Sequence, residues 1–145
     1  MKHLSFLSLA LLAFSLLFFS SCKKEEELSI RDKVIGTWIY QTITSTEYEG
    51  NTFVGSETDA ISGATVEFKG NDTFVSQFKD EDGSIDTDTG IWKLEGSNLV
   101  IDEDGDRETL KIQEITEKKM VLVIEEEFEE DGITYRYVNE LILVK

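Results

Sequence analysis

The hydrophobic pattern of the chain changes near residue 22. Residues 4–19 form an almost unbroken apolar run, whereas from residue 33 onward short stretches alternate apolar and polar residues. A period of two is typical of strands that bury one face. Runs rich in Ile, Val, Thr and aromatic residues predict eight strands, at residues 34–45, 64–69, 73–79, 89–94, 98–102, 107–116, 119–128 and 133–145.

Most of these runs are separated by short segments rich in Gly, Asn and Asp, which indicate tight turns. A helix over residues 107–130 is the main alternative, because Glu, Lys, Leu and Met favour helices. The alternation around Leu110 and Ile112 and the β-branched run 120–124 favour strands there instead. An open meander would leave two exposed edges. We therefore predict an all-β fold, an eight-stranded antiparallel up-and-down β-barrel.

Strand alternation also predicts which side chains face the barrel interior. The inward candidates are Trp38, Tyr40, Val66, Phe68, Phe74, Ser76, Phe78, Trp92, Leu94, Leu99, Ile101, Leu110 and Ile112. Their size favours a filled core, but ligand pockets are also mostly apolar, so a hollow barrel stays open as an alternative. The candidate ligand-binding residues are aromatic: Trp38, Tyr40, Phe53, Phe68, Phe78 and Trp92.

Two segments do not fit a plain barrel. The connection 45–63 is long for a compact domain, and it predicts a functional segment such as a lid, an extra hairpin or a loose surface loop. Residues 120–124 and 141–144 are apolar on both faces, although a barrel strand needs only one buried face. Their outer faces need a cover, for which the candidates are residues 28–34, a protein partner or a lipid surface.

The N-terminal residues 1–21 have the layout of a secretory signal peptide. A basic start at Lys2 precedes the apolar run 4–19, and the small residues Ser20 and Ser21 follow it. The run is shorter than the ~20 residues that a membrane-spanning helix needs. We therefore expect cleavage rather than a transmembrane anchor.

The stretch "FFSSC" that ends at Cys22 resembles the lipobox of bacterial lipoproteins, with Phe19 where Leu is usual. This resemblance implies that Cys22 becomes the lipidated first residue, and two or more acyl chains anchor a protein stably. The following "KKEEE" resembles the export signal of surface-exposed lipoproteins in Bacteroidetes-type bacteria. The expected organisation is a signal peptide (1–21), a lipidated charged tether (22–32) and a barrel domain (33–145). We expect the protein to be attached to the outer membrane by lipid and exposed on the surface, with the periplasmic face as the alternative.

Composition excludes several classes of function. The chain has 30 acidic and 14 basic residues, and loss of the leader with Lys2 would leave 13 basic residues and a net charge of −17. Such a charge argues against nucleic-acid binding, which relies on Lys and Arg. His3 is the single histidine and Cys22 the single cysteine, so the domain lacks the groups for Cys/His zinc sites and for Cys–His or Ser–His–Asp catalysis.

Carboxylates are the remaining groups with catalytic or metal-binding potential. "DEDGSIDTD" (80–88) and "DEDGD" (102–106) lack the spacing of calcium-binding EF-hand loops, and Asp-Gly is itself a favoured hairpin turn. Acids on turns and outward faces have nothing to raise their pKa for acid–base chemistry. We predict no catalytic residue, no metal site and no cofactor.

Several strand motifs resemble one known family. "IGTW" (35–38) is similar to the Gly-x-Trp opening of lipocalins, and "VEFKGNDTF", "GIWKLEGSNLVI" and "LKIQEIT…MVLVI" resemble hairpins of lipocalin-like lipoproteins from Bacteroidetes. The resemblance spans residues 33–145. It implies that Trp38 closes the barrel base against a basic residue from a late strand, for which Arg136 is the candidate.

The resemblance also implies a function without chemistry. We expect a non-enzymatic, lipid-anchored lipoprotein of the cell envelope whose barrel binds a small apolar or amphipathic ligand. The alternative is a protein-interaction or structural accessory lipoprotein with a filled barrel and an unknown protein partner.

Overall fold

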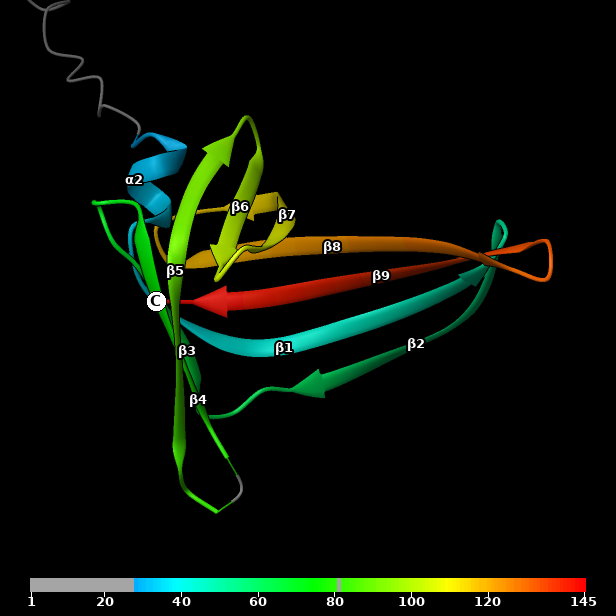
Figure 1. Cartoon of the computed structure of the whole chain (residues 1–145), viewed down its shortest axis with the longest axis horizontal. Helices are drawn as coiled ribbons and strands as arrows, with labels where there is room; N and C mark the ends of the chain where they lie inside the picture. Colours follow the sequence, from blue (N-terminus) through cyan, green and yellow to red (C-terminus); the bar gives the residue numbers. More distant parts are fainter. Residues whose placement is uncertain (1–27, 81) are drawn as a thin grey trace, which may run out of the picture.

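The computed structural model describes residues 28–80 and 82–145, and they form an all-β domain with one short helix (Figure 1). The elements are α2 (Ile30–Val34), β1 (Gly36–Glu49), β2 (Thr52–Ala60), β3 (Ala64–Phe68), β4 (Thr73–Lys79), β5 (Ile85–Glu95), β6 (Asn98–Glu103), β7 (Asp106–Ile115), β8 (Lys119–Glu130) and β9 (Ile133–Val144). The helical alternative for residues 107–130 is excluded, since β7 and β8 occupy that region.

The sheet closes into a barrel through its first and last strands. Its order is β2-β1-β3-β4-β5-β6-β7-β8-β9, and β1 also pairs with β9. That pairing is antiparallel and runs from Ile39 opposite Val144 to Glu49 opposite Tyr135. The eight strands β1 and β3–β9 therefore form the closed antiparallel meander that the sequence predicts, and β2 is an additional strand.

Residues 45–63 form the extra hairpin rather than the lid. β2 pairs with the outer half of β1, where Thr42 lies opposite Ala60. β3 pairs with the inner half of the same edge, where Ile39 lies opposite Thr65. Since β2 and β3 follow each other along one edge of β1, they act as a single strand interrupted at residues 61–63.

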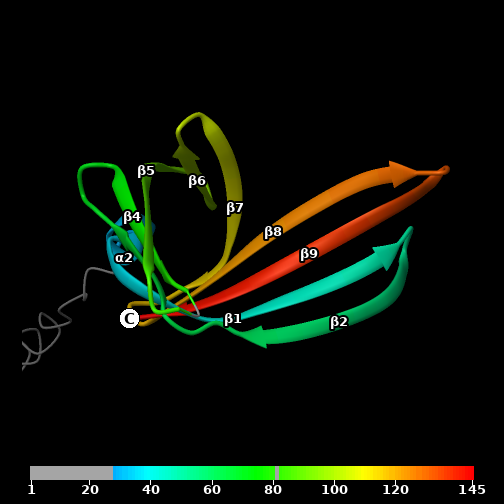
Figure 2. The same cartoon turned by 60° about the horizontal axis from the view of Figure 1, so that its bottom comes forward.

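The extra hairpin lengthens one side of the barrel. In Figure 2 the strands β8, β9, β1 and β2 reach well beyond the curled part of the sheet formed by β4–β7. We call this four-stranded extension the ribbon; it consists of residues 42–49, 52–60, 124–130 and 133–140. The ribbon prolongs the barrel wall on one side only, so the barrel is open on the side from which the ribbon extends.

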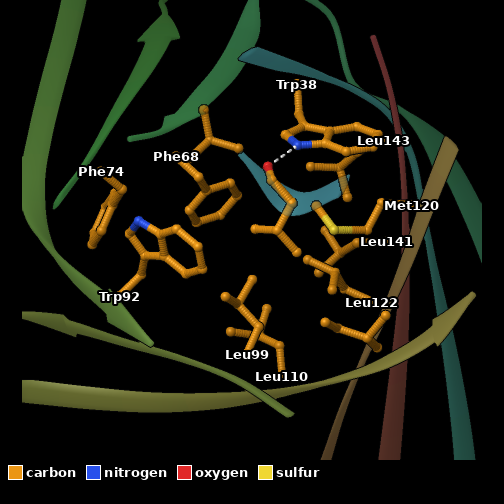
Figure 3. Close-up of a cluster of buried hydrophobic side chains, with 13 residues drawn as sticks. Trp38, Phe68, Phe74, Trp92, Leu99, Leu110, Met120, Leu122, Leu141 and Leu143 are labelled. Atoms are coloured by element: carbon orange, nitrogen blue, oxygen red, sulfur yellow. Dashed lines mark hydrogen bonds between the residues drawn. The ribbon is translucent and has the colours of Figure 1, made fainter. Parts of the chain in front are cut away.

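The opposite end of the barrel is closed by α2. The hydroxyl of Ser29 accepts a hydrogen bond from the backbone N–H of Asp32 at 3.2 Å and begins the helix. Val34 at its end is completely buried, and its carbonyl accepts a hydrogen bond from Trp38 Nε1 at 2.7 Å (Figure 3). Within the described part of the chain, no helix has the length and apolar character to cross a membrane.

The helix changes two expected boundaries. Residues 30–32, which the sequence assigns to the tether, belong to α2, and the first strand begins at Gly36 rather than at residue 34. The apolar side chains of residues 28–34 do not provide the expected cover for the outer faces of β8 and β9: Val34 joins the core inside the barrel end, and Leu28 and Ile30 are 45% and 42% exposed. Instead, the ion pair Lys119–Glu114 (2.9 Å) lies beside that outer surface, where Val121 is 4% exposed.

The core lies between α2 and the middle of the barrel (Figure 3). It consists of Val34, Trp38, Val66, Phe68, Phe74, Trp92, Leu99, Leu110, Ile112, Met120, Leu122, Leu141 and Leu143. The alternation along the strands correctly predicted the members contributed by β1 and β3–β7. Burial of so many large apolar side chains supplies the main favourable free energy of the fold.

Gly90 marks the tightest point in the barrel wall. It lies opposite Phe74 in the β4–β5 pairing. A Cβ atom at this position would lie 2.3 Å from the carbonyl oxygen of Asp102 and 2.6 Å from the Phe74 ring. Only glycine allows β5 to pass between its neighbours here.

Gly90→Ala is therefore expected to destabilise the domain by about 1–3 kcal/mol, because the strands must separate to admit the methyl group. Urea unfolding measures the change. The matched control is Gly55→Ala, another glycine within a strand, where nothing lies within 4 Å of the added Cβ. The control should change stability by less than about 0.5 kcal/mol, and equal effects of the two substitutions would contradict the prediction.

Candidate functional site

A cavity of about 200 Å³ lies inside the barrel, beyond the packed core. Six strands, β1, β3, β4, β6, β7 and β8, supply its lining, which is Tyr40, Val66, Phe68, Phe74, Ser76, Phe78, Leu99, Ile101, Glu103, Glu108, Leu110 and Leu122. The barrel is thus filled at its closed end and hollow above it. The filled core expected from the sequence is found at the closed end, and the alternative, a hollow interior, is found next to it.

The wall of the cavity is largely aromatic. The ring centroids of Tyr40 and Phe78 are 6.2 Å apart, and those of Phe68 and Phe74 are 6.3 Å apart. Phe68 also packs edge-on against Trp92 at 5.5 Å, which separates the cavity from the closed end. Strand alternation brings these rings together, because they come from inward positions of β1, β3, β4 and β5.

Two hydroxyl groups face this apolar wall. Ser76 is only 6% exposed. Within the described residues, neither its hydroxyl nor that of Tyr40 makes a hydrogen bond to another group. No side-chain nitrogen or oxygen that is sealed from solvent lacks a partner in the described part of the chain, so the Ser76 hydroxyl is open to the cavity. Both hydroxyls are available to a ligand.

Burial raises the pKa of Tyr40 to about 12, and the nearby Glu108 carboxylate adds to the shift. The phenol therefore stays neutral and can donate or accept a hydrogen bond throughout the physiological range.

Carboxylates mark the open end of the cavity. Partial burial raises the pKa of Glu108, and the charge of Glu126 on β8 raises it further. The pKa of Glu103 is also raised, by loss of solvation and by the charges of Asp88, Asp104 and Asp106. No Lys or Arg is among the described residues that line the cavity. The cavity therefore has an apolar floor and a negatively charged rim.

The predicted ligand-binding residues are distributed over three places. Tyr40, Phe68 and Phe78 line the cavity together. Trp38 and Trp92 are 0% and 2% exposed and belong to the core near the closed end. Phe53 is 59% exposed and packs against Tyr48 on the ribbon, so it does not line the cavity.

The prediction that Arg136 packs against Trp38 is wrong. Arg136 lies opposite Tyr48, near the tip of the ribbon, and its guanidinium carbon is 4.0 Å from the centre of the Tyr48 ring. Ten residues of extended strand separate Tyr48 from Trp38, about 33 Å at the usual rise. The basic residue over Trp38 is Lys145, whose Nζ is 4.5 Å from the ring centre.

Besides covering Trp38, Lys145 links the end of β9 to the end of α2. Its Nζ donates hydrogen bonds to the carbonyls of Lys33 and Ile35, each at 2.8 Å. These carbonyls lie at the end of α2, where the helix leaves them without internal partners. The role that the sequence assigned to Arg136 is thus filled by the residue that follows β9.

The sequence reasoning omitted Glu103, Glu108 and Ser76 from the candidate site. A signal for Glu108 was present, since it has the same strand parity as the inward residues Leu110 and Ile112. Glu108 was not predicted to face inward because charged residues were assigned to turns and outward faces. Ser76 was predicted to face inward, but nothing in the sequence showed that space would remain beside it.

A second depression, of about 640 Å³, lies between α2 and the outer surface of β5 and β6. Its charged groups already pair with one another: Arg31 with Asp72, and Lys93 and Arg107 with Glu95. All of these side chains are at least 40% exposed. The barrel cavity is the better candidate site, although it is smaller, because Ser76 in its wall is buried and its hydroxyl is unpaired.

A family model described as a lipocalin-like domain matches residues 34–122. The chain belongs to the lipocalin-like domain family. A search of curated proteins finds no significant match.

Two solved structures share the fold. A lipocalin-like protein from Bacteroides uniformis ATCC 8492 superposes with a TM-score of 0.54 at 14% identity, over 78% of this chain and 98% of that one. Apocrustacyanin C1 superposes with a TM-score of 0.54 at 20% identity, over 83% of this chain and 64% of that one. At these identities the likeness concerns the fold alone.

In the acidic turns of this lipocalin-like domain, aspartate side chains accept hydrogen bonds from backbone N–H groups of the same turn. The Asp82 carboxylate accepts hydrogen bonds from the backbone N–H and the hydroxyl of Ser84, at 2.9 and 2.7 Å, and the first of these is the main cause of its lowered pKa. Asp102 accepts one from the backbone N–H of Gly105 at 3.1 Å. Among the described residues, no three His, Cys, Asp or Glu side chains are grouped so that they could hold a metal ion.

Titration of Tyr40 is expected to make the domain less stable at alkaline pH. Its folded pKa of about 12 lies above the ordinary tyrosine value of 10.0. The stabilisation is therefore complete below pH 10 and is lost as the pH rises toward 12. We expect the wild type to lose up to roughly 2 kcal/mol more stability over this range than Tyr40→Phe, which cannot titrate.

Urea unfolding at several pH values between 9 and 12 measures the difference. Tyr48→Phe on the ribbon leaves Tyr40 in place and should retain the wild-type loss. If Tyr40→Phe lost stability as steeply as the wild type, Tyr40 would not be the buried phenol responsible.

Proposed function

We propose that this lipocalin-like domain is a non-enzymatic binding module that holds a small apolar or amphipathic molecule in the barrel cavity. The observation that carries the proposal is a cavity of about 200 Å³ with aromatic walls and two unpaired hydroxyl groups. Ligand sites typically combine an apolar lining with a few polar groups that orient the ligand. A merely structural barrel would gain stability by filling this space.

The size of the cavity limits the ligand. A dry apolar cavity of ~150 Å³ is large enough for benzene, and sites for drug-sized molecules are usually ~300 Å³ or larger. The ligand is therefore a compact molecule, about one ring with a short substituent. Ser76 and Tyr40 would hydrogen-bond its polar end.

The same proposal includes a lipid anchor at Cys22, which lies outside the described residues. The stretch from Cys22 to Leu28 can span at most about 20 Å. Since α2 follows directly and closes one end of the barrel, a lipid on Cys22 would hold the closed end toward the outer membrane. The cavity mouth and the ribbon would face away from the membrane, on the cell surface.

A second candidate function is favoured by the ribbon. The ribbon extends beyond the closed barrel and exposes large apolar side chains, among them Phe53 and Phe128 at 59% and 48% exposed. Exposed apolar side chains gathered on one extension are typical of protein interaction sites. A protein-interaction lipoprotein would use this surface and would need no ligand in the barrel.

Ser76→Leu separates the two candidates. The larger side chain enters the cavity, so the variant is expected to lose at least about tenfold in affinity for a compact neutral fluorescent dye such as 1-naphthol. Dye fluorescence and native mass spectrometry of co-purified small molecules are the measurements, made on residues 23–145. Gln77→Leu, at the next position on β4 and facing outward, is the matched control and should bind as the wild type does.

Absence of dye binding and of co-purified molecules in the wild type would reject the ligand-binding function and leave the protein-interaction candidate. Loss of dye binding in Gln77→Leu to the same extent as in Ser76→Leu would place the dye outside the cavity.

Cys22→Ala tests the anchor. The variant should lose palmitate labelling and move from the membrane to the soluble fraction, because thioether lipidation needs the sulfur atom. Ser21→Ala keeps a small residue before the cysteine and should still be labelled. Palmitate labelling of Cys22→Ala would refute the lipid attachment while leaving the ligand-binding proposal unaffected.

A further inference from the structure

The charge around the cavity narrows the chemical class of the ligand. The rim carries Glu103 and Glu108, and Glu126 on the neighbouring β8 is close enough to raise the pKa of Glu108. Among the described residues no Lys or Arg lines the cavity, and Arg107, which adjoins the rim, is paired with Glu95. An anionic ligand would lose its hydration at the rim and meet the carboxylates of Glu103 and Glu108, so fatty acids and other carboxylates are disfavoured.

The cavity has features that a cluster of surface acids would lack. Ser76 is more than nine-tenths buried, and its unpaired hydroxyl opens on the cavity below the acidic rim. Tyr40 adds a second unpaired hydroxyl, close enough to Glu108 for the carboxylate to raise the pKa of the phenol. A group that donates several hydrogen bonds could reach a hydroxyl oxygen and a carboxylate together.

The aromatic walls suit the same kind of ligand. Tyr40 and Phe78 lie side by side on the cavity wall, with ring centroids 6.2 Å apart. Aromatic faces attract organic cations, most strongly where water is excluded. The chain as a whole carries a net charge of −16, which favours the approach of cations.

We infer that the cavity binds a small organic cation, an amine with one aromatic or compact apolar group, with the apolar group inside the barrel and the ammonium at Glu108. This inference rests on the proposed ligand-binding function and specifies its ligand. The ammonium donates hydrogen bonds to the Glu108 carboxylate and to the hydroxyl of Tyr40 or Ser76. The apolar group packs against Phe68, Phe74 and Leu110.

Three probes of nearly equal size test the inference: 2-phenylethylamine, 2-phenylethanol and phenylacetate, which are cationic, neutral and anionic at pH 7. They are titrated calorimetrically into the full-length chain in one nonionic detergent. The expected order of affinity is amine, then alcohol, then carboxylate. Glu108→Gln should reduce the affinity for the amine about five- to tenfold and change that for the alcohol by less than about twofold.

Glu67→Gln is the matched control. It removes the same charge from the barrel, but Glu67 lies on the outward face of β3, where its side chain is 49% exposed beside Lys69. Its affinity for the amine should stay within about twofold of the wild type. Glu103→Gln provides a second rim variant should Glu108→Gln fold poorly, and circular dichroism verifies the fold of each variant.

The outcomes separate the two proposals. If the alcohol binds and the amine binds no more tightly, or if Glu67→Gln weakens the amine as much as Glu108→Gln, the cation inference is overturned and the ligand-binding function stands. If neither 1-naphthol nor any of the three probes binds the wild type, both proposals are rejected. A preference for phenylacetate would overturn the inference directly.

Discussion

The pairing of β1 with β9 is the interaction on which the rest of the structure depends. It joins the two ends of the meander and removes two open sheet edges, which closes the barrel. The same hydrogen-bonded register continues past the barrel into the ribbon, as far as Glu49 and Tyr135. Barrel closure and ribbon therefore have one origin, the length of β1 and β9.

Closure also decides where the interior is filled. At one end α2 inserts Val34, Trp38 bonds to its carbonyl, and Lys145 covers the Trp38 ring. At the other end no helix or loop of the described residues fills the interior, and the side chains along the wall are Tyr40, Ser76 and Phe78. The cavity follows from this asymmetry: one end is plugged, large side chains pack beside the plug, and space remains beside Ser76 toward the other end. It supports binding by a rigid, preformed site, which costs little conformational entropy on association.

Much of the fold was predictable from the sequence because its signals are local. Alternation showed the inward faces of β3–β7, and Gly, Asn and Asp marked the turns. The resemblance of the Gly-x-Trp segment to lipocalins agrees with the family that the chain belongs to. Residues 45–63 were less predictable, since a lid and an added hairpin have the same polar composition with scattered aromatics. Only the pairing of β2 with the free edge of β1 distinguished them.

The candidate site was predictable in part. Tyr40, Phe68 and Phe78 were found because inward aromatics follow from strand parity, whereas Phe53 was assigned to the cavity on the assumption that its segment is a lid. Arg136 was misassigned for a different reason. Whether a late-strand basic residue reaches Trp38 depends on the β1–β9 register, and that register sets Arg136 beside Tyr48.

The sequence by itself determined the chemical inventory of this protein: an acidic chain, a barrel domain without histidine or a second cysteine, and strands with one apolar face. These properties depend on single residues and their nearest neighbours along the chain. The tertiary structure decided which side chains come together: Lys145 over Trp38, Glu108 in the same cavity wall as Tyr40, and a space left next to Ser76. Such contacts join residues far apart in the sequence, and they depend on the register and the packing volume that barrel closure imposes.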